Sequence, residues 1–237
     1  DKTIHSLSIS EHKQEFKKLK DVVKYAARAS CQIIGYNEDY SSGSGTAYFI
    51  TKDGYLITNQ HVVDGKSRLM LLREINNEVL TKNAKVVFED KSKDLALLKT
   101  DSAFPNSTSI IINDQTEIEM GEEIIYVGYP SSPITSGSEP FTSRGIISQI
   151  VKDDHRIPAL VLFDLTANPG SSGSSVIKQS TGELVGTLTW GFGRSISVDD
   201  VADLIGGESI RIKESQNVGT TVNVLVDFLK ESGLYKK

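Results

Sequence analysis

Short β-type runs separated by turn residues fill most of this chain, and they restrict its fold more than any other feature. Eleven such runs lie between residues 31 and 190, with Gly, Asn, Asp and Ser concentrated between them. They are CQIIGY, TAYFIT, GYLITN, RLMLLRE, AKVVFE, LALLKT, EIIYVGY, RGIISQIV, ALVLFDL, SSVIK and ELVGTLTW. Because no helical pattern lies between them, the runs favour antiparallel barrels or a sandwich over βαβ units. The segments TKDG (51–54) and STGE (180–183) are typical of hairpin turns.

Helical periodicity marks both ends of the chain. Residues 10–30 are predicted to form an amphipathic helix, because Phe16, Leu19 and Ala26 recur at helical spacing. Residues 222–233 return to that spacing, with Gly233 as a stop signal. Residues 192–217 fit neither period, and we interpret them as a surface loop with one short helical turn.

The composition limits the partners that the chain is expected to bind. With 237 residues and a net charge of -5, it gives no reason to expect nucleic acid or an anionic membrane. No apolar run of about 18 residues is present, so we expect no membrane span. Cys31 is the only cysteine, so we expect no internal disulfide, no metal and no other cofactor. The apolar residues that follow it predict a buried, inert thiol.

One of the four histidines differs from the others in its surroundings. His5, His12 and His155 lie among polar residues, where a solvated side chain is the simplest interpretation. His61 follows an apolar run that ends at Thr58 and precedes two valines. Packing would therefore hold the residue while its ring faces a cleft. Taken alone, this position is more often structural than catalytic.

Two further stretches hold residue types that can act with such a histidine. Asp94 opens KDLALLKT. It either starts a strand at a turn or accepts a histidine N–H and fixes the tautomer of the ring. The segment NPGSSGSS (168–175) is pinned between two apolar runs, which argues against a flexible linker. Gly170 and Gly173 flank two serines, and such a turn can direct successive N–H groups into an oxyanion hole.

Together and in this order, the three stretches resemble the trypsin-like serine peptidases, most closely the protease domain of the HtrA/Deg branch. SGSGTAYFITKDGYLITNQHVV is similar to the block that carries that branch's catalytic histidine, which implies His61. DLALLK is similar to the aspartate block and DLTANPGSSGSSVI to the nucleophile block, which imply Asp94 and Ser172. The resemblance runs from about residue 20 to residue 230.

The resemblance implies an all-β, chymotrypsin-like fold within a single domain over 1–237. Two six-stranded antiparallel barrels would occupy about 31–112 and about 117–221, with the N-terminal helix before them and the C-terminal helix after them. In the site, His61 would take the proton of Ser172 and Asp94 would orient the ring, while the N–H groups of Gly170 and Ser172 bind the oxyanion. Four residues would line the substrate pocket: Thr166, Thr189, Trp190 and Gly191. None of them is acidic or a histidine, which favours a small or medium uncharged residue before the scissile bond.

The chain departs from the family pattern in two respects. Ser171 stands where the family has asparagine, and Ser174 stands where it has a second glycine, as in the staphylococcal glutamyl endopeptidases and exfoliative toxins. Neither change touches the implied nucleophile or an oxyanion-hole glycine, so we expect an active serine endopeptidase. The sequence also ends after the final helix, without a PDZ domain.

Two alternatives to a protein-cleaving enzyme stay open. A catalytically silent or activator-dependent protein of the same fold would bind peptides without cleaving them, and an esterase would use the same site. Protein or peptide substrates are the expected partners, and the resemblance leaves a homo-oligomer open. The sequence begins at Asp1 rather than Met and HtrA-like proteins often work outside the cytoplasm. The compartment is unknown from the sequence, and export to the periplasm or the medium is favoured.

Overall fold

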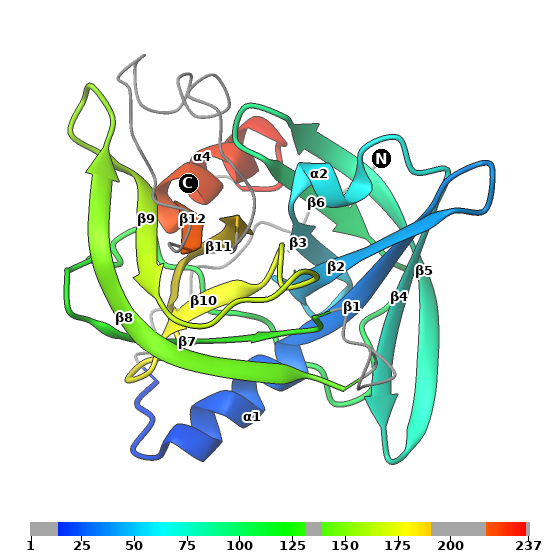
Figure 1. The fold of residues 1–237 in the computed structure, drawn as a ribbon, viewed down its shortest axis with the longest axis horizontal. Coiled ribbons are helices and arrows are strands. Elements are labelled where there is room, and N and C mark those ends of the chain that lie inside the picture. The colour runs from blue at the N-terminus through cyan, green and yellow to red at the C-terminus, as the bar shows by residue number, and fades with distance from the viewer. Residues whose placement is uncertain (1–13, 131–138, 191–216, 236–237) are drawn as a thin grey trace.

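The computed structural model describes residues 14–130, 139–190 and 217–235, and it contains two closed antiparallel barrels of six strands each. Figure 1 shows the barrels side by side, with helix α1 (Leu19–Ala29) at the lower edge and helix α4 (Val222–Glu231) against the second barrel. The predicted all-β fold of two six-stranded barrels with a helix at each end is confirmed.

The first barrel closes through its strands in the order β1-β2-β3-β6-β5-β4. Its interior is apolar and includes Ile33, Leu56 and Leu98. Cys31 is buried in this interior, as predicted, and burial raises the pKa of its thiol to about 12. The strands are β1 (Ser30–Tyr36), β2 (Ser42–Phe49), β3 (Tyr55–Thr58), β4 (Arg68–Ile75), β5 (Glu78–Asp90) and β6 (Leu95–Lys99).

The second barrel closes in the order β10-β11-β12-β9-β8-β7 around a core that includes Tyr126, Phe163 and Val176. Its last strand, β12, is absent from the eleven runs that the sequence pattern indicates. The sequence of β12, NVGTT, is short and has no alternation of apolar and polar residues. All five of its residues are nevertheless buried. The strands are β7 (Glu123–Gly128), β8 (Phe141–Lys152), β9 (Pro158–Asp164), β10 (Ser175–Lys178), β11 (Leu184–Trp190) and β12 (Asn217–Thr221).

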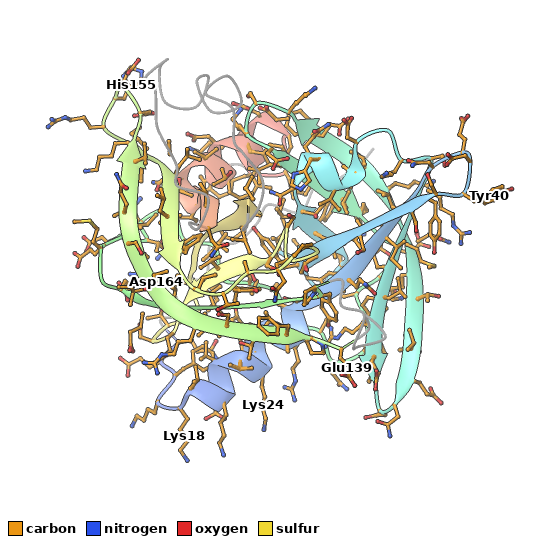
Figure 2. The ribbon with its side chains drawn as sticks, in the orientation of Figure 1. Lys18, Lys24, Tyr40, Glu139, His155 and Asp164 are labelled. Atoms are coloured by element: carbon orange, nitrogen blue, oxygen red, sulfur yellow. The ribbon has the colours of Figure 1, made fainter. Side chains whose placement is uncertain are left out.

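Helix α1 is shorter than the predicted helix over about 10–30. It begins at Leu19, and the described residues before it, 14–18, are not helical; residues 10–13 lie outside the described part. The N–H of Phe16 donates to the Ser180 carbonyl at 2.7 Å, so a contact with the β10–β11 turn replaces helical bonding there. Along the helix, Lys24 points away from the barrels in Figure 2, while Val22 on the opposite face is buried.

Helix α4 begins at Val222, as predicted, where the hydroxyl of Thr221 accepts the N–H of Val224. It ends at Glu231, and Gly233 follows with φ +76°, a backbone conformation that glycine adopts without strain. The predicted loop over 192–217 lies outside the described residues, except that Asn217 is the first residue of β12.

A third apolar cluster joins the two barrels to both helices. It contains Tyr48 from β2, Val127 from β7 and Leu225 from α4. The hydroxyl of Tyr48 lies 2.8 Å from the hydroxyl of Thr187 on β11, which links the barrels across their interface. None of the helices in the described ranges combines the length and apolar character needed to span a bilayer. The packed interface fixes the position of one barrel relative to the other, and the candidate site lies along it.

Candidate active site

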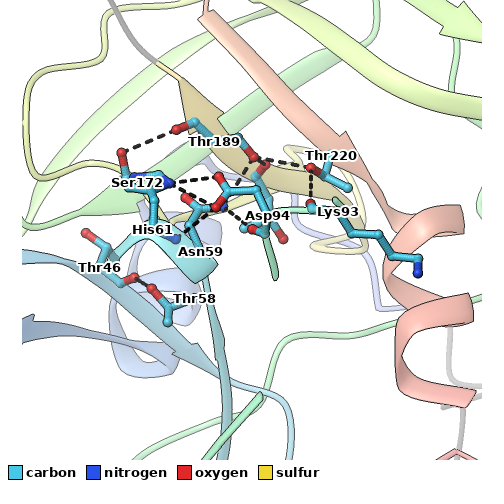
Figure 3. Close-up of polar contacts among 10 residues, drawn as sticks. Thr46, Thr58, Asn59, His61, Lys93, Asp94, Ser172, Thr189 and Thr220 are labelled. Carbon is cyan, nitrogen blue, oxygen red and sulfur yellow. Dashed lines mark hydrogen bonds and ion pairs between the residues drawn. The ribbon is translucent and has the colours of Figure 1, made fainter. Parts of the chain in front are cut away.

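The first barrel brings His61 and Asp94 into contact. His61 lies in the short helix α2 (Gln60–Val63), directly after β3, and Asp94 directly precedes β6. Strands β3 and β6 are antiparallel neighbours, with Thr58 opposite Ala96, so the end of one strand meets the start of the other. The carboxylate of Asp94 accepts the backbone N–H of His61 at 3.0 Å, and its Oδ2 lies 2.8 Å from Nδ1 of the ring (Figure 3).

A buried amide supports this pair. Asn59 Nδ2 donates to the Asp94 carbonyl at 2.9 Å and to Thr189 Oγ1 at 3.2 Å, the latter on β11 of the second barrel. Asp94 has φ +50°, an uncommon conformation for a residue with a side chain, and the bond from Asn59 helps to hold it. The one sequence signal for Asn59 is its position, a polar residue at the end of an apolar run two residues before His61.

The serines of the turn over 168–174 differ in exposure. Ser171 and Ser174 are 1% and 0% exposed, whereas Ser172 is only partly buried. The hydroxyl of Ser172 donates to the Thr189 carbonyl at 3.4 Å, a long hydrogen bond, as Figure 3 shows. Within the described part of the chain, no hydrogen bond joins Ser172 to His61. Ser172 is therefore the hydroxyl of this turn that an incoming molecule can reach.

The backbone of the turn is almost fully hydrogen-bonded. The N–H of Ser171 donates to the Asn168 carbonyl at 2.9 Å, that of Gly173 to the Leu188 carbonyl at 2.8 Å, and that of Ser174 to the Ser171 carbonyl at 3.1 Å. The N–H groups of Gly170 and Ser172 contact no acceptor among the described residues. Backbone donors are rarely left unpaired, so these two can bind an incoming oxygen.

The glycines of the turn allow it to lie against the first barrel. Gly170 and Gly173 have φ +93° and +87°. A Cβ at position 173 would lie 2.1 Å from the Thr46 carbonyl oxygen and 2.4 Å from the Thr58 hydroxyl. Only glycine combines this backbone angle with this close approach.

Comparison with known proteins adds to this geometry. Residues 43–186 match the family model of the trypsin-like peptidase domain. The chain belongs to this family. It is 32% identical over 200 residues to the serine protease Do-like HtrA of Lactobacillus helveticus, covering 81% of this chain and 45% of that protein. It is 31% identical over 155 residues to a probable periplasmic serine endoprotease, DegP-like, of Hahella chejuensis, covering 64% of this chain and 30% of that protein.

Solved structures show the same fold as this trypsin-like peptidase domain. The serine endoprotease from Yersinia pestis superimposes with a TM-score of 0.68 at 20% identity, covering 92% of this chain and 67% of that one. The family model and the 32% identity to a serine protease Do-like HtrA confirm the predicted resemblance to the HtrA branch. The chain spans less than half the length of the two curated relatives named above.

The predicted pocket residues of this trypsin-like peptidase domain lie in unlike surroundings. Thr166 is exposed, and its carbonyl accepts the Tyr126 hydroxyl at 2.8 Å. Thr189 is 1% exposed, and its hydroxyl is occupied by buried polar neighbours, so its backbone is what faces Ser172. The backbone of Trp190 pairs with Val218 in the sheet. The Trp190 side chain and Gly191 lie outside the described part.

The residue that replaces the family's asparagine has a partner of its own. Ser171 Oγ lies 3.2 Å from the hydroxyl of Tyr126, which is held in the core of the second barrel. Burial raises the pKa of Tyr126 to about 12, so the phenol stays protonated at neutral pH and can donate. Ser171 is thus part of the support of the turn.

The remaining histidines lie away from these residues or outside the description. His155 is exposed at the tip of the β8–β9 hairpin (Figure 2), as the sequence predicts. His5 and His12 lie outside the described residues. Among the described residues, His61 is therefore the histidine whose ring meets a carboxylate.

Proposed function

We propose that this trypsin-like peptidase domain is a serine endopeptidase that hydrolyses protein substrates through an acyl-enzyme on Ser172. One observation carries the proposal: the reachable hydroxyl of the turn belongs to Ser172, and the turn's N–H groups that have no acceptor among the described residues are those of Gly170 and Ser172. Its curated relatives are named as serine proteases, which supports the same reaction class.

His61 serves as the general base in this mechanism. Its Nδ1 lies against Asp94, which fixes the tautomer and leaves Nε2 to take the Ser172 proton. Ser172 Oγ bonds to the carbonyl carbon of the substrate, and His61 returns the proton to the amine as the C–N bond breaks. Water then attacks the ester with the same proton transfers in reverse, which releases the acid and restores Ser172.

The N–H groups of Gly170 and Ser172 stabilise the oxyanion that forms in each step. Each such donor contributes on the order of 3 kcal/mol to the transition state. The Ser172 hydroxyl must turn from the Thr189 carbonyl toward His61 before it reacts. A long bond of 3.4 Å is a weak hold, and catalytic hydrogen bonds often tighten only when substrate is bound.

The proposed specificity, partners and location of this protein rest on its membership of the trypsin-like peptidase family. A pocket formed by Thr166 and the β11 backbone at Thr189 and Trp190 carries no acidic residue and favours a small or medium uncharged side chain. Gly191, which the family resemblance adds to this pocket, lies outside the described residues. Relatives named as probable periplasmic serine endoproteases support export of this protein. A homo-oligomer is compatible with this proposal.

Covalent labelling tests the proposed nucleophile. A fluorophosphonate probe should add one adduct to the wild-type protein, read by intact mass, and none to Ser172→Ala. Ser174→Ala is the matched control, because the Ser174 hydroxyl is buried with no partner among the described residues; it should label like the wild type. Adducts that persist on Ser172→Ala would overturn the assignment of the nucleophile.

The silent-binder alternative predicts a different result. If the protein only binds peptides, the fluorophosphonate probe would label neither the wild type nor Ser172→Ala. Denatured casein would stay intact with both proteins. The esterase alternative predicts turnover of activated esters without cleavage of casein. Cleavage of casein by the wild type, lost in Ser172→Ala, would exclude both.

A further inference from the structure

We infer that the hydroxyl of Thr46 is a positioning group for the nucleophile turn (residues 168–174), because it holds the peptide unit that lies between the two that carry the proposed oxyanion donors. This inference rests on the serine endopeptidase function proposed above. Thr46 lies on β2 of the first barrel and is 0% exposed. Figure 3 shows it beside the turn, on the side of the first barrel.

Thr46 contacts the turn at two carbonyl groups. Its Oγ1 donates to the Gly170 carbonyl at 2.9 Å, and its backbone N–H donates to the Ser172 carbonyl at 2.8 Å. Peptide units are planar, so each fixed carbonyl also fixes the N–H of the next residue. The peptide that carries the Ser172 N–H lies between these two anchored carbonyls.

The hydrogen bond from the Thr46 hydroxyl is needed at the Gly170 carbonyl in particular, because the backbone of Gly170 is the least restrained. With φ +93° and no Cβ, this residue does not fix the orientation of its peptide by its own sterics. An external hydrogen bond therefore selects one orientation. In that orientation the Ser171 N–H donates back to the Asn168 carbonyl, and the Gly170 N–H is left without an acceptor in the described chain.

The same hydroxyl connects the turn to the rest of the second barrel. Thr46 Oγ1 accepts the N–H of Tyr129, just after β7, at 2.9 Å. The Thr46 carbonyl in turn accepts the Thr58 hydroxyl at 2.7 Å, which fixes the threonine to β3. One oxygen atom from the first barrel thus links two segments of the second, and valine at this position would leave both of their polar groups without it.

The test compares substitutions that keep or remove the hydroxyl. Thr46→Val should lower the second-order rate of fluorophosphonate acylation about ten- to hundred-fold, because small displacements of oxyanion donors have effects of that size. Thr46→Ser, which keeps the hydroxyl, should stay within about two-fold of the wild type. With a peptide ester, Thr46→Val should lower kcat and leave KM nearly unchanged.

Thr187→Val is the matched control. It also removes a buried threonine hydroxyl at the barrel interface, the one bonded to Tyr48, and among the described residues this hydroxyl makes no hydrogen bond to the turn. It should lose comparable thermal stability and keep the wild-type acylation rate. Equal slowing in Thr46→Val and Thr187→Val would attribute the effect to a looser interface and overturn the inference, as would wild-type rates in Thr46→Val.

Two further outcomes have defined meanings. If Thr46→Val and Thr46→Ala both fail to fold while Thr46→Ser folds, the hydroxyl serves stability alone and the inference is wrong. If the wild type itself does not label, the proposed function fails. The hold on the turn is then judged separately by amide hydrogen exchange. Thr46→Val must reduce protection of the Ser171 N–H, which shares a peptide unit with the Gly170 carbonyl, and Thr46→Ser must preserve it.

Discussion

The two barrels hold their halves of the site in different ways. In the first, the Asp94 carboxylate binds both the backbone and the ring of His61 at 2.8–3.0 Å, so the side chains themselves are fixed. In the second, the backbone of the nucleophile turn is fixed, while the Ser172 hydroxyl has one long bond of 3.4 Å. The difference indicates that the His61 ring is oriented in advance and that the Ser172 hydroxyl keeps the freedom to rotate toward it.

The largest expected effect comes from breaking the fixed pair in the first barrel. Asp94→Asn keeps the shape of the side chain but donates a hydrogen bond where the carboxylate accepts one, so it favours the wrong tautomer of His61. We expect kcat on a peptide substrate to fall by about 10⁴-fold, measured by steady-state kinetics. A loss below ten-fold would show that Asp94 does not orient the base.

The next effect comes from disturbing the backbone of the turn in the second barrel. Gly173→Ala places a Cβ 2.1 Å from the Thr46 carbonyl oxygen at φ +87°, so it should cost about 2–5 kcal/mol of unfolding free energy and reduce acylation at least about 100-fold. Gly121→Ala is the control, because its φ is +84° with no atom within 4 Å of the added Cβ. Urea denaturation should show a loss of about 1 kcal/mol for it, and equal losses in the two variants would contradict the close approach.

A smaller effect is expected from substituting the buried tyrosine that contacts Ser171 in the turn. Tyr126→Phe removes the donor to the Thr166 carbonyl and the partner of Ser171, so it should lower the free energy of unfolding by about 1 kcal/mol. Tyr129→Phe removes only a 3.4 Å bond to the Ser30 carbonyl and should cost less. KM for a peptide substrate should rise for Tyr126→Phe and stay unchanged for Tyr129→Phe. An unchanged KM in Tyr126→Phe would show that this tyrosine does not support the substrate pocket.

The smallest expected effect concerns the one thiol of the chain. Cys31 is buried in the first barrel with its pKa raised to about 12, so the reactive thiolate is scarce at pH 8. Iodoacetamide should leave the native protein unmodified while the fluorophosphonate probe labels it, and should modify the urea-unfolded chain once, as read by intact mass. Rapid alkylation of the native protein would mean that the first barrel opens far more readily than its packing indicates.

Local patterns in the sequence are sufficient to predict most of the fold. Eleven strands, the start of the final helix and the burial of Cys31 follow from short apolar runs and turn residues. Strand β12 is missed because NVGTT has one apolar side chain, Val218, and so carries neither an apolar run nor a period-two signal, although all five residues are buried. The predicted helix starts too early because the tertiary contact between Phe16 and Ser180 ends it, and no local propensity reveals a contact over that separation.

The candidate site also contains residues that the sequence predicts and residues that only tertiary contacts reveal. The order of the motifs points to His61, Asp94 and Ser172, and that these three form a catalytic triad stays a prediction, although the structure brings the first two into contact. Asn59 and Thr46 carry no such signal, because a polar residue in or beside an apolar strand acquires its role only from its partners. Those partners are Thr189 for Asn59 and Gly170 for Thr46, both on the other barrel.

The separation along the chain between the two halves of the site has a consequence for how the protein is made. The contact between His61 and Asp94 spans 33 residues, whereas that between Thr46 and Gly170 spans 124. Synthesis proceeds from the N-terminus, and long-range contacts form late because a large loop must close first. We therefore expect the contact between His61 and Asp94 to form earlier than the contact between Thr46 and the turn over 168–174. The proposed peptidase activity would then arise only after the first barrel has folded.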